Sequence, residues 1–99
     1  MKADIPDHIL DSIIDLARRE GLSRLILFGS RARGDGWDRS DIDLAFPARD
    51  ASQYLEFQEG LEEIDTLLKF DLVDMNGFAF SKALEDEIRR DGIIIYESI

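Results

Sequence analysis

Two neighbouring stretches decide the fold: LILFGSRARG at residues 25–34 and SDIDLAF at residues 40–46. The first opens with an apolar run of four residues, which is typical of a buried strand and stops at Gly29. A short helix is expected to follow, with Ser30 as its cap. The two stretches therefore predict a strand, a sharp turn, one turn of helix, a loop and a second strand.

The second stretch alternates between apolar and acidic residues. Ile42, Leu44 and Phe46 fall on one face of the expected strand, and Asp41 and Asp43 fall on the other. Aspartate is disfavoured in strands, so two of them on one face require a specific reason. Residues two apart on a strand are roughly 7 Å apart at Cα. Two carboxylates at that spacing can bridge a hard cation such as Mg²⁺.

The rest of the chain alternates between helices and strands. This order predicts an α/β (α+β) two-layer sandwich, in which helices pack on a small mixed sheet of about four strands. The strand order is left open by the sequence. The remaining elements are expected as a helix from Pro6 to just before Gly21, a helix from Tyr54 to Leu68, a strand at Phe70–Met75, a helix at Ser81–Arg90 and a strand at Ile93–Tyr96.

The segment after the first strand has the groups that hold phosphates. Gly29 allows the backbone to approach a ligand closely, and Ser30 adds a hydroxyl at a helix start, where free N–H groups attract anions. Arg31 and Arg33 add positive charge within one turn. A phosphate-holding turn beside a metal-holding pair predicts metal-assisted displacement at phosphorus.

Composition narrows the classes of function. A chain of 99 residues is the size of one domain, taken as residues 1–99. Its net charge of −10, from 22 acidic and 12 basic residues, argues against a nucleic acid substrate and against adsorption to an anionic membrane. The absence of cysteine excludes disulfides. With no signal peptide or membrane-spanning run in the sequence, a cytoplasmic location is expected.

The string GSRARG…SDIDLA resembles the signature of the DNA polymerase β-type nucleotidyltransferases, a glycine–serine pair followed by Asp-x-Asp. It is most similar to the minimal nucleotidyltransferases, called MNT proteins. The resemblance runs from Leu25 to Phe46 without a departure, and more weakly at residues 70–74 and 93–96. It implies a polymerase β palm-like fold and transfer of a nucleoside monophosphate from a nucleoside triphosphate, with release of pyrophosphate. It also implies two Mg²⁺ ions, which Mn²⁺ can replace.

The same resemblance implies a set of site residues. A third carboxylate, at the first aspartate of a segment like 70–73, falls on Asp71. That residue would share one ion and help to activate the acceptor hydroxyl. The implied catalytic and metal-binding residues are Asp41, Asp43 and Asp71, and the implied nucleotide-binding residues are Gly29, Ser30, Arg31 and Ser40.

Some of these assignments have structural alternatives. Asp71 and Asp74 are three apart, so on a strand they face opposite ways and only one of them can join the pair. Spacing alone leaves that choice open. Arg31 is either a phosphate contact or an ordinary helical arginine, and Ser40 either supports Asp41 or only turns the chain. Trp37 either stacks on a base, contacts a partner or folds back on its own domain.

The resemblance also implies a partner, a small all-helical HEPN protein in a hetero-oligomer. The expected function is that of an antitoxin, which adds AMP from ATP to a hydroxyl of the HEPN protein; in some cases in the family this is a tyrosine hydroxyl. A chain of this length buries only about 65% of its unfolded surface, so we expect a partner or a second copy to complete the acceptor site. Two alternatives are open. One is transfer to a small-molecule hydroxyl held by a separate substrate-binding subunit, and the other is a non-catalytic antitoxin that acts by binding alone.

Overall fold

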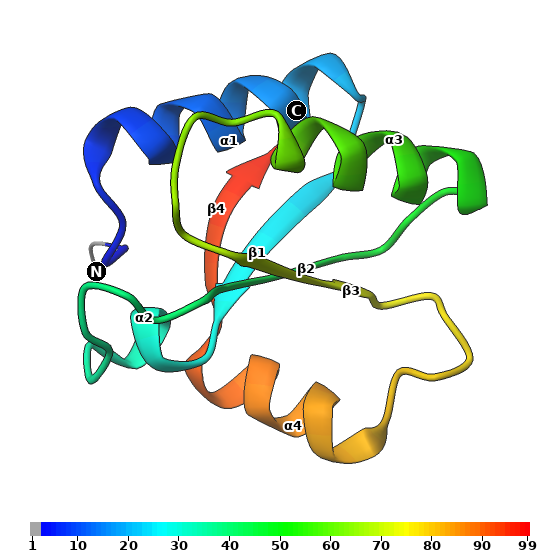
Figure 1. Ribbon diagram of the computed structural model, residues 1–99. Coiled ribbons are helices and arrows are strands. Elements are labelled where there is room, and N and C mark those ends of the chain that lie inside the picture. Colours follow the sequence, from blue (N-terminus) through cyan, green and yellow to red (C-terminus); the bar gives the residue numbers. More distant parts are fainter. Residues whose placement is uncertain (1–2) are drawn as a thin grey trace.

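The computed structural model describes residues 3–99. Within this part of the chain, four strands form one mixed sheet in the order β3-β2-β1-β4 (Figure 1). The central strand β1 (Arg24–Phe28) is antiparallel to both β2 (Ile42–Phe46) and β4 (Ile93–Glu97), and β3 (Phe70–Asp74) is parallel to β2. The expected α+β fold with a four-stranded mixed sheet is confirmed.

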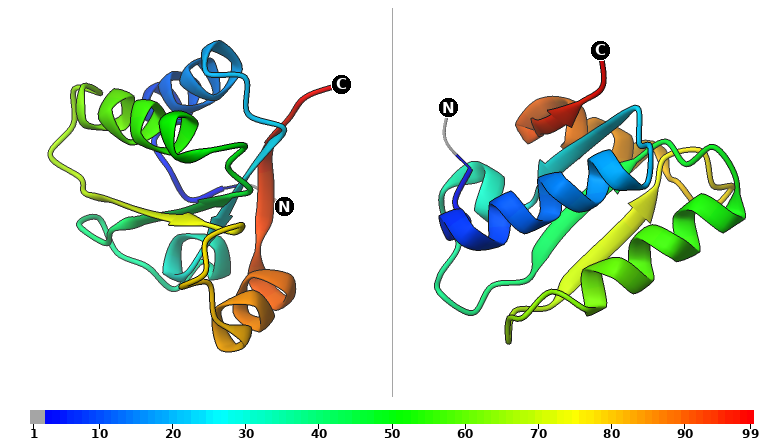
Figure 2. Two further views of the ribbon diagram at one scale, coloured as in Figure 1. Left: turned by 90° about the vertical axis from the view of Figure 1, so that its right-hand side faces the viewer. Right: turned by 90° about the horizontal axis from the view of Figure 1, so that it is seen from above.

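The helices lie on both faces of this sheet. The helices α1 (Asp7–Arg19) and α3 (Ala51–Glu62) lie side by side on one face, and α4 (Lys82–Asp91) covers part of the other (Figures 1 and 2). The single turn of α2 (Ser30–Arg33) follows β1 directly. The two-layer sandwich is thus formed by the sheet with α1 and α3, and α4 adds a partial layer on the opposite face.

The alternation in β2 assigns its side chains to the two faces. Ile42, Leu44 and Phe46 are fully buried in the main core beneath α1 and α3. Ala45 belongs instead to a smaller cluster that includes Ile88 of α4. Because side chains alternate along a strand, Asp43 lies on the same face as Ala45, which is the face that α4 only partly covers.

A buried glutamine joins the ends of α1 and α3. Gln53 is 2% exposed. Its Oε1 accepts a hydrogen bond from the Arg49 backbone N–H at 2.7 Å, and its Nε2 donates to the carbonyls of Glu20 at 3.1 Å and Gly21 at 3.2 Å. Asp50 caps the same helix by accepting from the Gln53 N–H at 2.8 Å.

Gln53→Ala is expected to lower the free energy of unfolding by about 2–3 kcal/mol, because it removes the partner of three backbone groups in partly buried hydrogen bonds. Gln58→Ala, on the same helix, is the matched control and is expected to change stability by less than about 0.5 kcal/mol. Urea unfolding of both variants measures the difference. Equal effects in the two variants would contradict the role assigned to Gln53.

Two local expectations were wrong. The helix expected from Tyr54 to Leu68 ends at Glu62. Ile64 and Leu68 lie in the connection to β3 and pack against the main core. They are apolar because they are partly buried there, and not because they lie on a helix. The N-cap of α2 is Gly29, with no side-chain cap hydrogen bond, because Ser30 already lies within the helix.

No helix in residues 3–99 is long and apolar enough to cross a membrane.

Candidate active site

Gly29 brings the turn after β1 directly against the carboxylate of Asp43. Its φ is +75°, in the left-handed region that favours glycine. A Cβ at this position would overlap a carboxylate oxygen of Asp43 and lie 3.1 Å from its Cγ. The sharp turn expected at Gly29 is therefore present, and the absence of a side chain lets the turn and the acidic strand share one surface.

The register of the sheet brings two aspartates side by side. Asp43 pairs with Phe28 of β1 on one side and with Asp71 of β3 on the other. Neighbouring strands are about 5 Å apart, and paired side chains lie on the same face. Asp41 lies two residues before Asp43, directly ahead of β2. The structure thus gathers the three aspartates at one end of the neighbouring strands β2 and β3, beside Gly29. We call this end of the sheet the Gly29 edge.

The surroundings raise the pKa of Asp43 to about 6, from an ordinary value of 3.8. Burial is the largest cause, the negative charges of Asp71, Asp41 and Glu87 add to it, and Arg33 opposes it. Carboxylates that share a site resist ionising together. A bound cation would relieve this repulsion.

The donor set at this edge fits a hard divalent cation. Mg²⁺ is commonly held by one or two carboxylates, with waters and substrate phosphate oxygens completing its shell. Among residues 3–99, no three His, Cys, Asp or Glu side chains converge closely enough to hold a metal by themselves. With its phosphate oxygens, a bound substrate would complete the shell. Asp41, Asp43 and Asp71 are the residues that would hold the cation.

Asp74 has a different position from Asp71. It pairs with Phe46, whose side chain lies in the main core. Its Oδ1 accepts hydrogen bonds from the backbone N–H of Ala48 at 3.1 Å and of Asn76 at 2.9 Å. Asp74 therefore organises the chain at the far end of β2 and β3. Of the two candidates left open by spacing, Asp71 is the one beside Asp43.

Arg31 is a buried structural residue in this arrangement. It is 4% exposed. Its Nε donates to the Ser40 carbonyl at 2.9 Å, Nη1 to the Asp4 carbonyl at 2.8 Å, and Nη2 to the carbonyls of Trp37 at 3.3 Å and Asp38 at 3.0 Å. These bonds use four of the five guanidinium donors. The expected contact between Arg31 and the nucleotide does not fit this geometry, because the guanidinium holds the loop between α2 and β2.

The two expected serines face each other across a glycine. A Cβ built on Gly36 would lie 3.1 Å from Ser30 Oγ and 3.4 Å from Ser40 Oγ. Ser40 Oγ also accepts a hydrogen bond from the Trp37 N–H at 2.9 Å, so it closes the loop that leads to Asp41. Trp37 is 68% exposed, which excludes the alternative that it folds back into its own domain.

An ion pair beside the carboxylates was not expected from the sequence. Arg33 Nη1 lies 3.6 Å from Glu87 Oε2, and Arg33 Nε lies 3.1 Å from Asp35 Oδ2. Arg33, the last residue of α2, thus links α2 to α4 and is the positive charge that acts on Asp43. Glu87 reaches this edge because α4 runs back along the sheet, and no sequence spacing indicates that.

The raised pKa of Asp43 predicts a dependence of stability on pH. The folded protein binds this proton more tightly than the unfolded chain. The protonated Asp43 carboxyl therefore contributes its full stabilisation of the fold below pH 3.8, and this contribution is lost as the pH rises through about 6. The full shift corresponds to about 3 kcal/mol. Because Asp43 is only half-buried, solvent screening reduces this to about 1–2 kcal/mol.

Asp43→Asn is accordingly expected to raise the free energy of unfolding by about 1–2 kcal/mol at pH 8 without divalent cations. The gain over the wild type should shrink as the pH falls from 6 to 4. Thermal unfolding of both proteins across this range in chelator-treated buffer measures the difference. A variant that is less stable than the wild type at pH 8 would contradict the prediction.

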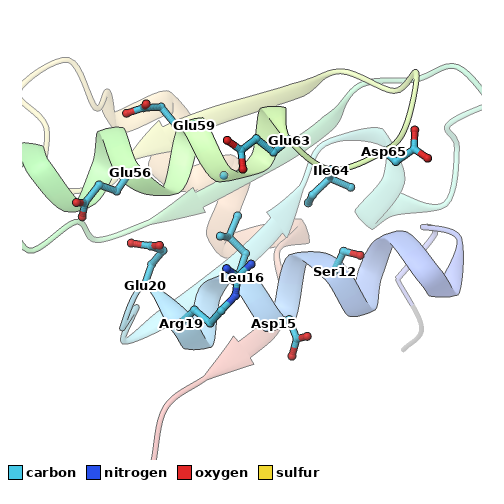
Figure 3. Close-up of a pocket in the computed structure, with 11 residues that line it drawn as sticks. Ser12, Asp15, Leu16, Arg19, Glu20, Glu56, Glu59, Glu63, Ile64 and Asp65 are labelled. Carbon is cyan, nitrogen blue, oxygen red and sulfur yellow. The ribbon is translucent and has the colours of Figure 1, made fainter.

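A groove of about 540 Å³ lies between α1 and α3, on the other face of the sheet (Figure 3). Leu16 points toward Gly60 at its floor, where a Cβ would approach Leu16 Cδ1 to 2.5 Å. Six acidic side chains make this groove unsuited to an anionic nucleotide. The acidic residues that line the groove are Asp15, Glu20, Glu56, Glu59, Glu63 and Asp65.

A glycine–serine turn and a row of aspartates at one edge of a mixed sheet define the class, an enzyme of nucleotidyl transfer. Residues 11–98 match the family described as Polymerase beta, Nucleotidyltransferase, and the chain belongs to this family. No curated protein matches the chain.

Solved structures of toxin–antitoxin complexes contain chains similar to this one. One is a toxin–antitoxin complex with AMP-PNP, whose matched chain is 28% identical with a TM-score of 0.69, over 90% of this chain and 73% of that chain. Another is a mutant MntA–HpeT complex with two Asp-to-Glu substitutions two positions apart, at 26% identity and a TM-score of 0.68 over the same shares. A third is the tri-AMPylated Shewanella oneidensis HEPN toxin in complex with an MNT antitoxin, at 26% identity and a TM-score of 0.65, over 93% of this chain and 72% of that chain. The resemblance to the MNT proteins is thereby confirmed.

Proposed function

We propose that this protein transfers AMP from ATP to a hydroxyl group of a HEPN-type helical partner and so acts as the antitoxin of a toxin–antitoxin pair. The observation that carries the proposal is the register that sets Asp43 beside Asp71 and against Gly29. Membership of the nucleotidyltransferase family supports the reaction. The similar chains in toxin–antitoxin complexes, one with AMP-PNP and one with an AMPylated toxin, support the donor and the partner.

In the proposed reaction, the turn at Gly29 and the hydroxyl of Ser30 position the triphosphate of ATP. The acceptor oxygen forms a bond to the α-phosphorus while the bond from that phosphorus to the bridging oxygen breaks, and pyrophosphate leaves with the electron pair. A carboxylate oxygen of Asp71 receives the proton of the acceptor hydroxyl. Asp41 and Asp43 fix the geometry at the α-phosphate.

The cofactor proposed for this site is Mg²⁺, as two ions held by Asp41, Asp43 and Asp71, with Mn²⁺ as a substitute. When bound, these ions offset the charge that develops on the phosphate oxygens. Arg31 and Ser40 support the reaction through the loop that they hold together. The cytoplasm is the compartment that we propose for this reaction.

Neutralisation of the partner in cells separates this function from the two alternatives. The HEPN-type partner is expressed with the wild type, with Asp41→Asn/Asp43→Asn or with an empty vector, and growth and partner mass are measured. We expect growth and a partner whose mass has increased by AMP only with the wild type. Neutralisation by the unreactive double variant would establish binding alone. Transfer only to a small molecule, with the partner unmodified, would establish a small-acceptor enzyme.

A further inference from the structure

A hollow lies beside Asp41, on the side of β3. It is lined by Arg39, Asp41, Leu67, Leu68 and Lys69 and has a volume of about 420 Å³. We call it the Leu67 hollow. Its volume is within the range of small-ligand sites, roughly 300–1,000 Å³. Apart from Asp41, none of its lining residues has a role in the site described so far.

The Leu67 hollow and the Gly29 turn lie on opposite sides of the start of β2. Gly29 follows β1, whereas the segment that forms the hollow leads into β3, and the sheet order places β2 between those two strands. The Ile42 N–H donates to the Lys69 carbonyl at 2.9 Å, which fixes the hollow next to the beginning of β2. With the triphosphate at Gly29, the hollow lies on the other side of β2, at Lys69, two residues before Asp71 in the chain. We take this as the acceptor's side, because Asp71 is the residue proposed to receive the acceptor's proton.

The chemistry of the Leu67 hollow suits an anion attached to an apolar group. Within residues 3–99, the side chains of Arg39 and Lys69 make no ion pair or hydrogen bond with other residues, although the net charge of the protein is −10. They bring two positive charges to a hollow that the Asp41 carboxylate also lines. Leu67 is fully exposed and Leu68 is half-buried, so both offer an apolar surface beside these charges.

A nucleotide already joined to the acceptor has this combination of groups. A phosphodiester has one negative charge, which the two cations can bind by charge-assisted hydrogen bonds, and its nucleoside can lie against the leucines. An unmodified tyrosine hydroxyl has no such charge. Among the similar structures, the S. oneidensis toxin is tri-AMPylated, so an acceptor that already bears AMP occurs in a related complex.

We infer that the Leu67 hollow binds the phosphodiester and nucleoside of an acceptor that already carries one AMP, and so positions it for a second transfer. This inference rests on the proposed function. In the second transfer, a ribose hydroxyl oxygen of the bound nucleotide forms a bond to the α-phosphorus of ATP. The bond to the bridging oxygen breaks, pyrophosphate leaves, and the hydroxyl proton passes to the Asp71 carboxylate.

A binding experiment tests the inference without requiring transfer. The probe is the dinucleoside monophosphate ApA, titrated by calorimetry into the full chain with saturating α,β-methylene-ATP and Mg²⁺, which occupy the donor site without a cleavable bond to the α-phosphorus. The test variant is Arg39→Gln/Lys69→Gln. The matched control, Arg24→Gln/Arg49→Gln, removes the same charge from two exposed arginines at the opposite end of the sheet.

We expect ApA to bind the wild type and the control equally and to bind the test variant at least tenfold more weakly. The affinity for α,β-methylene-ATP should be the same in all three proteins. Failure of the wild type to bind ApA, or equal affinity in the test variant, would overturn the inference. A wild type that adds AMP to its partner but does not bind ApA would leave the proposed function standing. A wild type that binds ApA but transfers nothing would contradict the proposed function and the second transfer, and would leave the hollow as a binding site alone.

Discussion

Replacing Asp41 and Asp43 together by asparagine is expected to lower the rate of nucleotidyl transfer at least about a thousandfold, equivalent to about 4 kcal/mol of transition-state stabilisation. Asparagine keeps the shape of aspartate and removes its charge. The two substitutions leave Asp71 as the one member of the trio that can hold a cation. They also remove two of the negative charges that repel one another at this edge.

The double variant should therefore be folded but inactive. Initial rates with labelled ATP measure the activity, and thermal unfolding without divalent cations shows that the fold is kept or stabilised. Asp35→Asn/Asp38→Asn is the matched control, because it removes two exposed carboxylates from the neighbouring loop and is expected to leave the rate within about threefold. A double variant that keeps more than a tenth of the wild-type rate would exclude the assigned roles of Asp41 and Asp43.

Arg31→Met is expected to lower the free energy of unfolding by about 3 kcal/mol or more, since it leaves the carbonyl groups of four residues without their donor. Methionine retains much of the volume of the arginine stem, so the lost hydrogen bonds dominate. The loop that carries Ser40 toward Asp41 would lose its anchor, and transfer should fall together with stability.

Arg33→Met is the matched control two residues away. Its ion pairs are partly exposed, so its cost in stability should be below about 1 kcal/mol. Urea unfolding and calorimetric titration of ATP, performed on both variants, separate the two roles considered for Arg31. Unchanged stability of Arg31→Met with a large loss of ATP affinity would restore the direct nucleotide contact that the sequence suggested.

The sequence predicted the features of the site that depend on local pattern. Strand alternation set Asp41 and Asp43 apart from the buried face of β2, and the glycine in the motif marked the positive-φ turn. The parallel pairing that places Asp71 beside Asp43 was not readable from spacing, because register is a property of two strands. The family resemblance indicated Asp71 correctly as the neighbour of Asp43, where the spacing left Asp74 open.

Other features could not be predicted because they depend on packing between distant segments. An arginine in a one-turn helix gives no sign of burial, yet Arg31 lies beneath the loop of residues 37–40 and reaches back to Asp4. Glu87 comes close to the aspartates only because α4 crosses back over the sheet. The helix after Tyr54 was expected to be too long because Ile64 and Leu68 are apolar at helical spacing. They are apolar because they pack on the core, although the chain there already bends toward β3.

The most direct test of the central claim incubates the purified chain with α-labelled ATP, Mg²⁺ and its HEPN-type partner. We predict label on the partner that depends on the chain, requires the divalent cation and is absent with Asp41→Asn/Asp43→Asn. Absence of label from the partner with the wild type, while the partner is bound and inhibited, would contradict nucleotidyl transfer as its function and leave an antitoxin that acts by binding.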